Sequence, residues 1–477
     1  MKVDFNKLDR AFNPRVVAVI GDKKETNYMW LRGQKDFKGK LYSVQIDPRE
    51  VEGIKALGID NRTSLMDIQE PVDFAIVAVP RSAALRVLAD LISKDVGAAH
   101  FFTAGFSETD TEDGREAERK LTEMARAANF HLVGPNCMGI FSPKVGIRNA
   151  EVSYNTVGPV GFISQSGNHA VNFIQEAHIQ GLDINKAVSF GNGIVLDSAD
   201  YLDYFATDPD IKVIGMYIEG VKDGPGFVKS LKAAAVKKPV VIWKGGRTEE
   251  GVRAIGSHTG SLAIPQAVWE SAVRQCKAVQ VSRMEELIDT LKALLYLKPV
   301  RGSRVAAVGG SGGGSVAVAD AFAEAGLTLP PFSKESYAEF ASFWINVGGG
   351  YKNPVDTYNA NRREMRRILD ILERDGNTDN IALLFFARPA GPAGGPPMDA
   401  QLEPMRDMRD RTDKPVMAVV SSASDSRSIE AANNLMMKLQ EMGIPSFPGM
   451  ERGGLALKNA VDYYRMKKGG DSRAGLD

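Results

Sequence analysis

Short apolar runs alternate with helical stretches along the whole chain of 477 residues. Runs such as Val16-Val17-Ala18-Val19-Ile20 are rich in β-branched residues, and glycine, proline or polar residues follow each of them. This alternation is typical of parallel sheets whose strands are joined by crossover helices. The pattern therefore predicts an α/β fold throughout.

The predicted strands fall into three groups. The first group contains predicted strands at 16–20, 42–46, 74–79 and 100–103, followed by a helix over about 111–129 and a short strand at 131–133. The second contains strands at 160–163, 213–218 and 240–244 and ends with a helix over about 284–297. The third contains strands at 305–308, 381–386 and 416–420.

Three groups agree with the usual domain size of ~100–200 residues. We predict domains at 1–147, 148–299 and 300–468, with a linker at Pro299-Val300-Arg301-Gly302-Ser303, where proline and glycine end the preceding helix. The polar stretch 469–477 is expected to be a disordered tail.

Composition excludes several classes of protein. The 59 basic and 59 acidic residues balance, which argues against a nucleic-acid binder. Two cysteines, Cys137 and Cys276, are too few for a disulfide framework, and the chain begins without the apolar core of a signal peptide. No uncharged apolar stretch reaches the ~18 residues of a membrane span. We expect a cytoplasmic protein without nucleic-acid or membrane partners.

Two junctions between a strand and a helix have the composition of anion sites. They read Ser164-Gln165-Ser166-Gly167 and Ser311-Gly312-Gly313-Gly314, and helical stretches at about 170–179 and 316–325 follow them. The first N–H groups of a helix have no partner within it and attract negative charge, so each junction is a candidate phosphate site. The alternative is ordinary helix capping by serine and glycine.

His258 is the candidate nucleophile, in the run Gly256-Ser257-His258-Thr259-Gly260. With an unperturbed pKa of ~6.5, an imidazole is partly neutral at physiological pH and can accept and pass on a phosphoryl group. The alternative is a histidine in a surface loop. Glu219 follows the strand 213–218 and is a candidate for orienting the ring, or else an ordinary solvated carboxylate at a strand end.

The first turn of the chain argues against a dinucleotide site. It reads Gly21-Asp22-Lys23-Lys24 and lacks the Gly-x-Gly-x-x-Gly pattern whose glycines admit a pyrophosphate. Lys23 and Lys24 remain candidates for phosphate contacts. Asp47-Pro48 and Val79-Pro80 mark the carboxyl ends of two strands, where ligands bind in such sheets, although turn chemistry alone explains both pairs.

Together these motifs resemble the α chain of the NDP-forming acyl-CoA synthetases, the group of ADP-forming acetate–CoA ligases related to succinyl-CoA synthetase. The run from Gly256 to Ala263 is similar to that family's phosphohistidine loop, and Ser164-Gln165-Ser166-Gly167 to its phosphate-binding helix start. Gly134-Pro135-Asn136-Cys137 resembles a segment near the CoA thiol, and Asn353-Pro354-Val355-Asp356 a turn of the third domain. The resemblance extends over nearly the whole chain.

The resemblance implies a Rossmann-like CoA-binding domain followed by two flavodoxin-like, succinyl-CoA synthetase-like domains. It implies a ligase that interconverts a carboxylic acid, CoA and NTP with acyl-CoA, NDP and phosphate, with His258 as phosphoryl carrier and Glu219 as its partner. The implied CoA-binding residues are Gly21, Lys23, Lys24, Asp47, Pro48, Val79, Pro80, Ala104, Gly105, Asn136 and Cys137.

The chain departs from the family at three points. Its first turn has fewer glycines, and Ile264 stands where the histidine loop often has glycine. Three α/β domains leave no room for an ATP-grasp domain. The resemblance therefore implies a separate ATP-grasp β subunit that largely holds ATP or ADP with Mg²⁺, in an α2β2 assembly.

Two other functions remain open at this point. The first is a non-catalytic, CoA-responsive regulatory or scaffold protein, which would need neither His258 nor Glu219. The second is a CoA-dependent acyltransferase or CoA-transferase that reuses the fold, in which His258 would not be phosphorylated.

Overall fold

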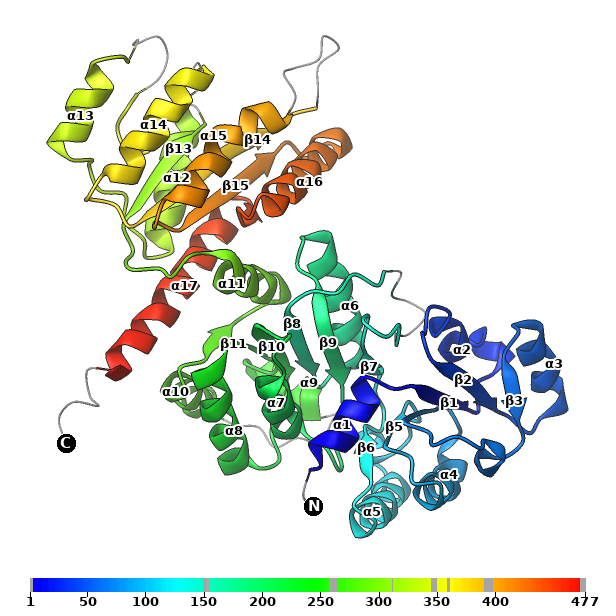
Figure 1. Cartoon of the computed structure of the whole chain (residues 1–477). Coiled ribbons are helices and arrows are strands. Elements are labelled where there is room, and N and C mark those ends of the chain that lie inside the picture. The colour runs from blue at the N-terminus through cyan, green and yellow to red at the C-terminus, as the bar shows by residue number, and fades with distance from the viewer. Residues whose placement is uncertain are drawn as a thin grey trace. The chain divides into compact units, whose positions relative to one another are not determined.

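The computed structural model of the chain describes residues 3–148, 152, 154–256, 265–310, 312–344, 350–357, 361–389 and 398–471. The chain forms two compact units, Met1–Met284 and Glu285–Asp477. Within the described residues the first unit contains two sheets and the second unit one, and helices flank each sheet (Figure 1). The predicted α/β fold is confirmed.

The first sheet has the strand order β3-β2-β1-β4-β5-β6, and every pairing in it is parallel. This is the Rossmann order, in which the chain reverses its direction of growth between β1 and β4. Its strands are β1 (Val16–Ile20), β2 (Lys40–Val44), β3 (Asp60–Arg62), β4 (Phe74–Val77), β5 (Ala98–Phe101) and β6 (His131–Val133). Its helices are α1 (Phe5–Phe12), α2 (Met29–Gly33), α3 (Pro48–Ala56), α4 (Arg81–Ser93) and α5 (Glu112–Ala127), with 3₁₀ turns η1 (Lys24–Thr26), η2 (Leu65–Asp67) and η3 (Ser107–Thr109).

The second sheet has the order β12-β11-β10-β8-β9-β7, with only β7 antiparallel among its described pairings. Counted from β8, this is the flavodoxin order 2-1-3-4-5. Its strands are β7 (Gly139–Phe141), β8 (Val160–Ser164), β9 (Ile184–Ser189), β10 (Val213–Ile218), β11 (Val240–Lys244) and β12 (Val279–Val281). Its helices are α6 (Gly167–Ile179), α7 (Ser198–Thr207), α8 (Gly224–Lys237), α9 (Glu249–Gly256) and α10 (Gln266–Gln275).

The third sheet has the order β13-β14-β15-β16, and parallel bridges join Arg304 to Thr328 and Val308 to Val355 beside β13. These bridges occupy the place of the second flavodoxin strand. The strands are β13 (Val305–Gly309), β14 (Asn380–Ala387), β15 (Val416–Ser422) and β16 (Ser446–Pro448). The helices are α11 (Met284–Tyr296), α12 (Gly312–Glu324), α13 (Lys334–Ala341), α14 (Arg362–Arg374), α15 (Met398–Arg411), α16 (Ser426–Glu441) and α17 (Met450–Asp471).

Several predicted boundaries shift, and several strands were missed. β2 and β5 each lie two residues earlier than predicted, and the edge strand β3 is too polar to show an apolar run. In β9 the apolar pattern is interrupted by Asn185 and Lys186. Both are buried. The Lys186 ammonium can be buried because it pairs with Asp208 at 2.6 Å. A buried ion pair thus hides a strand from sequence reasoning.

Helix α11 clusters with the third sheet, although the sequence placed it at the end of the second domain. Asp289 of α11 pairs with Arg452 of α17 at 2.7 Å, and Asn459 of α17 donates to Thr290 at 2.9 Å. The predicted domain boundary at 299 stays a prediction. Helix α17 continues to Asp471, so residues 469–471 are helical rather than part of a disordered tail.

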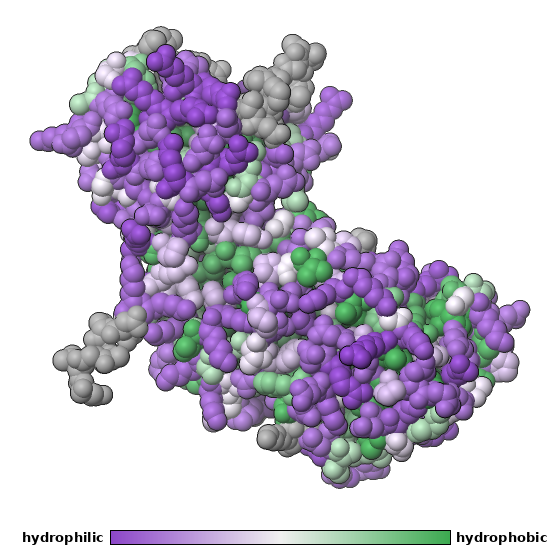
Figure 2. Space-filling view, viewed as in Figure 1, coloured by the Kyte–Doolittle hydropathy of each residue, from purple (hydrophilic) through white to green (hydrophobic). Residues whose placement is uncertain are grey.

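Burial follows the pattern of a doubly wound sheet. Every residue of β1, β8, β10 and β13 is buried, as expected for central strands covered on both faces. Hydrophilic residues dominate the face of the molecule that Figure 2 shows. Within the part of the chain that the structure describes, no helix has the length and apolar character needed to cross a bilayer.

Candidate functional site

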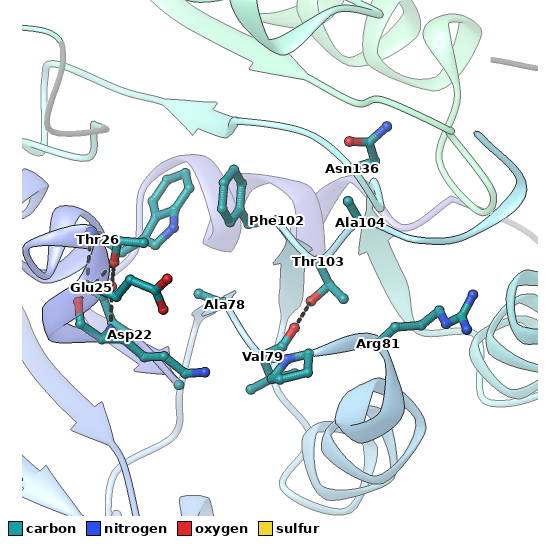
Figure 3. Close-up of a pocket in the computed structure, with 14 residues that line it drawn as sticks. Asp22, Glu25, Thr26, Ala78, Val79, Arg81, Phe102, Thr103, Ala104 and Asn136 are labelled. Atoms are coloured by element: carbon teal, nitrogen blue, oxygen red, sulfur yellow. Dashed lines mark hydrogen bonds between the residues drawn. The ribbon is translucent and has the colours of Figure 1, made fainter. Parts of the chain in front are cut away.

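A cavity of about 450 Å³ lies at the carboxyl ends of β1, β4 and β5 (Figure 3). Strand order reverses between β1 and β4, and the gap at such a point is where doubly wound sheets bind ligands. The lining residues are Gly21, Asp22, Lys23, Glu25, Thr26, Trp30, Ala78, Val79, Pro80, Arg81, Phe102, Thr103, Ala104 and Asn136.

Asp22 organises the first turn of this cavity. Its buried carboxylate accepts hydrogen bonds from the backbone N–H of Lys23 (3.0 Å), Trp30 (3.0 Å) and Leu31 (2.9 Å). Burial raises the pKa of this carboxyl above its ordinary value, although the hydrogen bonds oppose that shift. The start of α2 therefore already holds an anion, in the position that a glycine-rich turn leaves open for a phosphate.

Gly21 is required by packing at the same turn. It has φ +82°, and a Cβ there would lie 2.5 Å from Cγ1 of Val79. The close approach of the turns after β1 and β4 depends on this missing side chain.

The other side of the cavity, away from the Asp22 turn, is formed by neighbouring turns that hydrogen bonds join to one another. The Thr103 hydroxyl donates to the carbonyl of Val79 (2.8 Å), and the N–H of Asn136 donates to the carbonyl of Thr103 (3.0 Å). Asn136 adopts φ +57°, in the left-handed region that asparagine tolerates best after glycine. These bonds hold the turns after β4, β5 and β6 at one edge; Figure 3 shows the bond between Thr103 and Val79.

The structure brings six of the predicted CoA-binding residues to the cavity and leaves five out of its lining. Those in the lining are Gly21, Lys23, Val79, Pro80, Ala104 and Asn136; those outside it are Lys24, Asp47, Pro48, Gly105 and Cys137. Asp47 caps α3 and pairs with Arg49 at 2.7 Å, and the N–H of Gly105 donates to Glu108 at 2.6 Å.

Cys137 is a buried thiol. Its Sγ lies 3.8 Å from the carbonyl oxygens of Phe101 and Val133, and burial raises its pKa to about 12. At neutral pH this side chain is therefore an unreactive thiol packed inside the domain.

Sequence reasoning missed two aromatic residues and one arginine of the cavity lining. Trp30 and Phe102 form an aromatic edge with ring centroids 5.1 Å apart, and Arg81 opens α4 and hydrogen-bonds to Asp113 and to the carbonyl of Gly105. In the sequence, these residues are marked only by following a strand or starting a helix, and they belong to no recognisable motif.

Glu219 lies at the corresponding switch point of the second sheet, between β8 and β10. The side-chain oxygen of Gln165 accepts hydrogen bonds from the N–H groups of Glu219 (2.8 Å) and Gly220 (3.1 Å). Tyr217 donates its hydroxyl proton to the Glu219 carboxylate (3.2 Å), and the Lys244 ammonium donates to the Glu219 carbonyl (2.7 Å). Glu219 is thus held beside the start of α6.

The two candidate phosphate sites differ in the structural roles of their residues. Ser166 caps α6 by accepting from the N–H of His169 (3.4 Å), and Ser164 donates to the Ser166 carbonyl (2.6 Å). A Cβ on Gly167 would lie 2.7 Å from Cγ of Met138, so packing alone requires that glycine. At the start of α12, by contrast, a Cβ on Gly313 or Gly314 would meet nothing within 4 Å.

The loop that resembles the family's phosphohistidine loop falls mostly outside the described residues. Residues 257–264 and Ser311 lie outside the described residues, so the predicted positions of His258 and Ser311 stay predictions. Helix α9 ends at Gly256 and α10 begins at Gln266. A further histidine in this domain, His169, packs its ring against Tyr217 and Trp243, with centroids 4.4 Å and 4.7 Å away, and burial lowers its pKa.

Comparison with known proteins assigns the family. Residues 15–143 match the family model of a CoA binding domain, and residues 157–294 match that of a succinyl-CoA ligase like flavodoxin domain. The α subunit of the ADP-forming acetate–CoA ligase II of Pyrococcus furiosus is 32% identical over 469 residues, which cover 97% of this chain and 99% of that subunit. The chain belongs to the NDP-forming acyl-CoA synthetases, as an α subunit. The resemblance inferred from the motifs is confirmed.

Two further synthetases are similar to this chain, one by sequence and one by its solved structure. The ADP-forming acetate–CoA ligase I of Archaeoglobus fulgidus is 35% identical over 79% of this chain, but the match covers 55% of that protein. The solved structure of acetyl-coenzyme A synthetase 1 from Ca. Korarchaeum cryptofilum, in complex with phosphate and ADP, has a TM-score of 0.83. It is 27% identical and covers 98% of this chain and 99% of its own.

We expect Gly21→Ala to destabilise the first domain more than Gly58→Ala. Both glycines have positive φ, but a Cβ on Gly58 meets nothing within 4 Å. The clash with Val79 should therefore cost about 1–3 kcal/mol beyond the backbone strain that the two variants share. Thermal unfolding of both full-length variants measures the difference, and equal melting temperatures would contradict it.

We also expect both thiols to be unreactive in the native α subunit. Cys137 and Cys276 are buried, and burial raises the pKa of each, so little thiolate forms at pH 8. A colorimetric disulfide reagent should label neither cysteine before unfolding and both after it. Rapid native labelling that Cys137→Ser removes would show that this thiol is accessible.

Proposed function

We propose that this chain is the CoA-binding, phosphohistidine-bearing subunit of an NDP-forming acid–CoA ligase. The observation that carries the proposal is the near-complete match to an α subunit of an ADP-forming acetate–CoA ligase, over 97% of this chain. A switch-point cavity inside the matched CoA binding domain supports it. The reaction interconverts a carboxylic acid, CoA and a nucleoside triphosphate with acyl-CoA, the diphosphate and phosphate.

CoA is placed in the cavity of the first sheet. Lys23 and Arg81 line it and supply positive charge for the phosphates, while Trp30 and Phe102 supply an apolar edge. Because Asp22 occupies the start of α2, the phosphates are expected to contact side chains and the neighbouring turns rather than that helix start.

His258 is assigned the phosphoryl transfer. A ring nitrogen attacks the γ-phosphorus of the nucleotide and releases the diphosphate; the substrate carboxylate then attacks the phosphohistidine and leaves as an acyl phosphate. The CoA thiolate attacks the acyl carbon and expels inorganic phosphate. Glu219 would accept a hydrogen bond from the other ring nitrogen, and the helix starts at Ser164–Gly167 and 311–314 would hold the phosphoryl group by charge complementarity.

The nucleotide and its metal are assigned to a partner. The Archaeoglobus relative is matched over only 55% of its length, whereas the Pyrococcus α subunit is matched over 99%. We therefore propose a separate ATP-grasp β subunit. The α2β2 assembly that the family resemblance implies, and the cytoplasmic location that the composition predicts, are proposed with it.

His258→Asn should abolish phosphorylation of the chain. With its β partner and γ-labelled ATP, the wild-type chain should acquire a phosphate that is labile to acid and stable to base, because phosphorus is then bound to imidazole nitrogen. His178→Asn is the matched control, since His178 lies in the same domain and pairs instead with Asp183 (2.6 Å). A His258→Asn protein that still labels, or still forms acyl-CoA at the full rate, would overturn the mechanism.

Glu219→Gln should slow phosphohistidine formation by about 10–100-fold, because the amide cannot stabilise the positive ring as a carboxylate does. Affinity for CoA should not change, since Glu219 does not line the CoA cavity. Rapid-quench labelling and calorimetric titration with CoA measure the two effects. Glu176→Gln serves as the control and should behave like the wild type, since the Glu176 carboxylate lies on α6 and accepts a hydrogen bond from Gln180 just after that helix (2.8 Å).

A further inference from the structure

Lys222 lies three residues beyond Glu219, and hydrogen bonds anchor its partly exposed side chain. Its ammonium donates hydrogen bonds to the carbonyls of Asn192 (2.7 Å) and Gly193 (3.1 Å), in the loop that follows β9. Desolvation of the ammonium lowers its pKa, and the carboxylates of Glu118 and Asp197 partly offset that effect. A lysine in this position joins the loop after β10 to the loop after β9.

The loop after β9 contacts the wall of the first-domain cavity. The N–H of Asn192 donates to the carbonyl of Pro135 (3.1 Å), and the N–H of Ile194 donates to the carbonyl of Gly134 (3.2 Å). A Cβ on Gly191 would lie 2.3 Å from the carbonyl oxygens of Pro135 and Asn136. The loop is thus packed directly on the segment that places Asn136 in the cavity lining.

The side chain of Asn192 extends this contact to the other end of the wall. Its amide donates to the carboxylates of Glu108 (2.7 Å) and Glu118 (2.8 Å). Glu108 in turn accepts from the N–H of Gly105 (2.6 Å) and Phe106 (3.1 Å), directly after the lining residue Ala104. Both wall segments, 104–106 and 134–136, therefore meet at one loop of the second domain.

These bonds form a continuous path between two sites within one compact unit. We propose that Lys222 is a positioning residue that couples occupancy of the CoA cavity to the loop carrying Glu219, through Asn192. The proposal rests on the proposed function, because it takes CoA as the ligand of the cavity. A contiguous hydrogen-bond network with a charged link is a suitable carrier of such coupling, and coupling of binding sites is reciprocal.

The chain offers a matched control for a variant of Lys222. Lys238 is also a lysine with a lowered pKa, caused first by burial, and its ammonium also donates to two backbone carbonyls, those of Phe205 and Asp208. Lys222→Met and Lys238→Met thus remove the same chemistry at different places. Neither lysine is fully buried, and methionine keeps an unbranched side chain of similar length, which favours retention of the fold.

Hydrogen exchange on the full chain, with and without saturating CoA, tests the proposal. In the wild type and in Lys222→Met, CoA should protect amides in 102–106 and 134–138. In the wild type and in Lys238→Met, CoA should also slow exchange in 219–222 by about tenfold or more. That second protection should be lost in Lys222→Met. It should be reduced in Asn192→Ala, which removes the side-chain branch to Glu108 and Glu118 but keeps the backbone bonds to 134–135, and which serves if the lysine variant fails to fold.

The outcomes separate the inference from the proposed function. Undiminished protection of 219–222 in Lys222→Met and Asn192→Ala, or no CoA effect on 219–222 in a wild type whose cavity segments are protected, overturns the coupling alone. Absence of CoA binding to the wild-type chain overturns the proposed function and the inference with it.

Discussion

Parallel strand order is the constraint on which both candidate sites depend. Because every strand of a parallel ladder points the same way, the residues that follow the strands meet at one edge, and the reversal of order leaves a gap between two central strands. In the first sheet that gap lies between β1 and β4 and contains the cavity. In the second it lies between β8 and β10, where Gln165 ties the Glu219 turn to the start of α6.

The two gaps are filled by different means. In the first, the carboxylate of Asp22 satisfies the N–H groups at the start of α2, and Gly21 permits the neighbouring turn to pack closely. In the second, a neutral amide satisfies the N–H groups of the Glu219 turn. The start of α2 is therefore occupied by a carboxylate, whereas the N–H groups of the second turn are occupied by an amide and the turn carries the Glu219 carboxylate.

Contact between the two domains of the first unit is polar where it borders the cavity. The Asn192 amide donates to the carboxylates of Glu108 and Glu118, the Lys222 ammonium donates to the Asn192 carbonyl, and the carbonyls of Gly134 and Pro135 accept from the same loop. These directional bonds constrain the geometry of the loop after β9. The contact therefore joins the Glu219 turn to the wall of the cavity through directional hydrogen bonds as well as by packing.

The amino-acid sequence by itself determined the fold class, most strand positions and the family, since apolar runs such as Val213–Ile218 and the motifs around His258 and Ser164 are local signals. It also marked six of the cavity residues, because they follow strands. Only the tertiary structure decided that Cys137 is buried, that α11 packs with α17, and that Trp30, Phe102 and Arg81 share a cavity with Asn136. Burial and meeting at a sheet edge depend on strand order and on partners far along the chain, such as Asp208 for Lys186, and no local pattern encodes them.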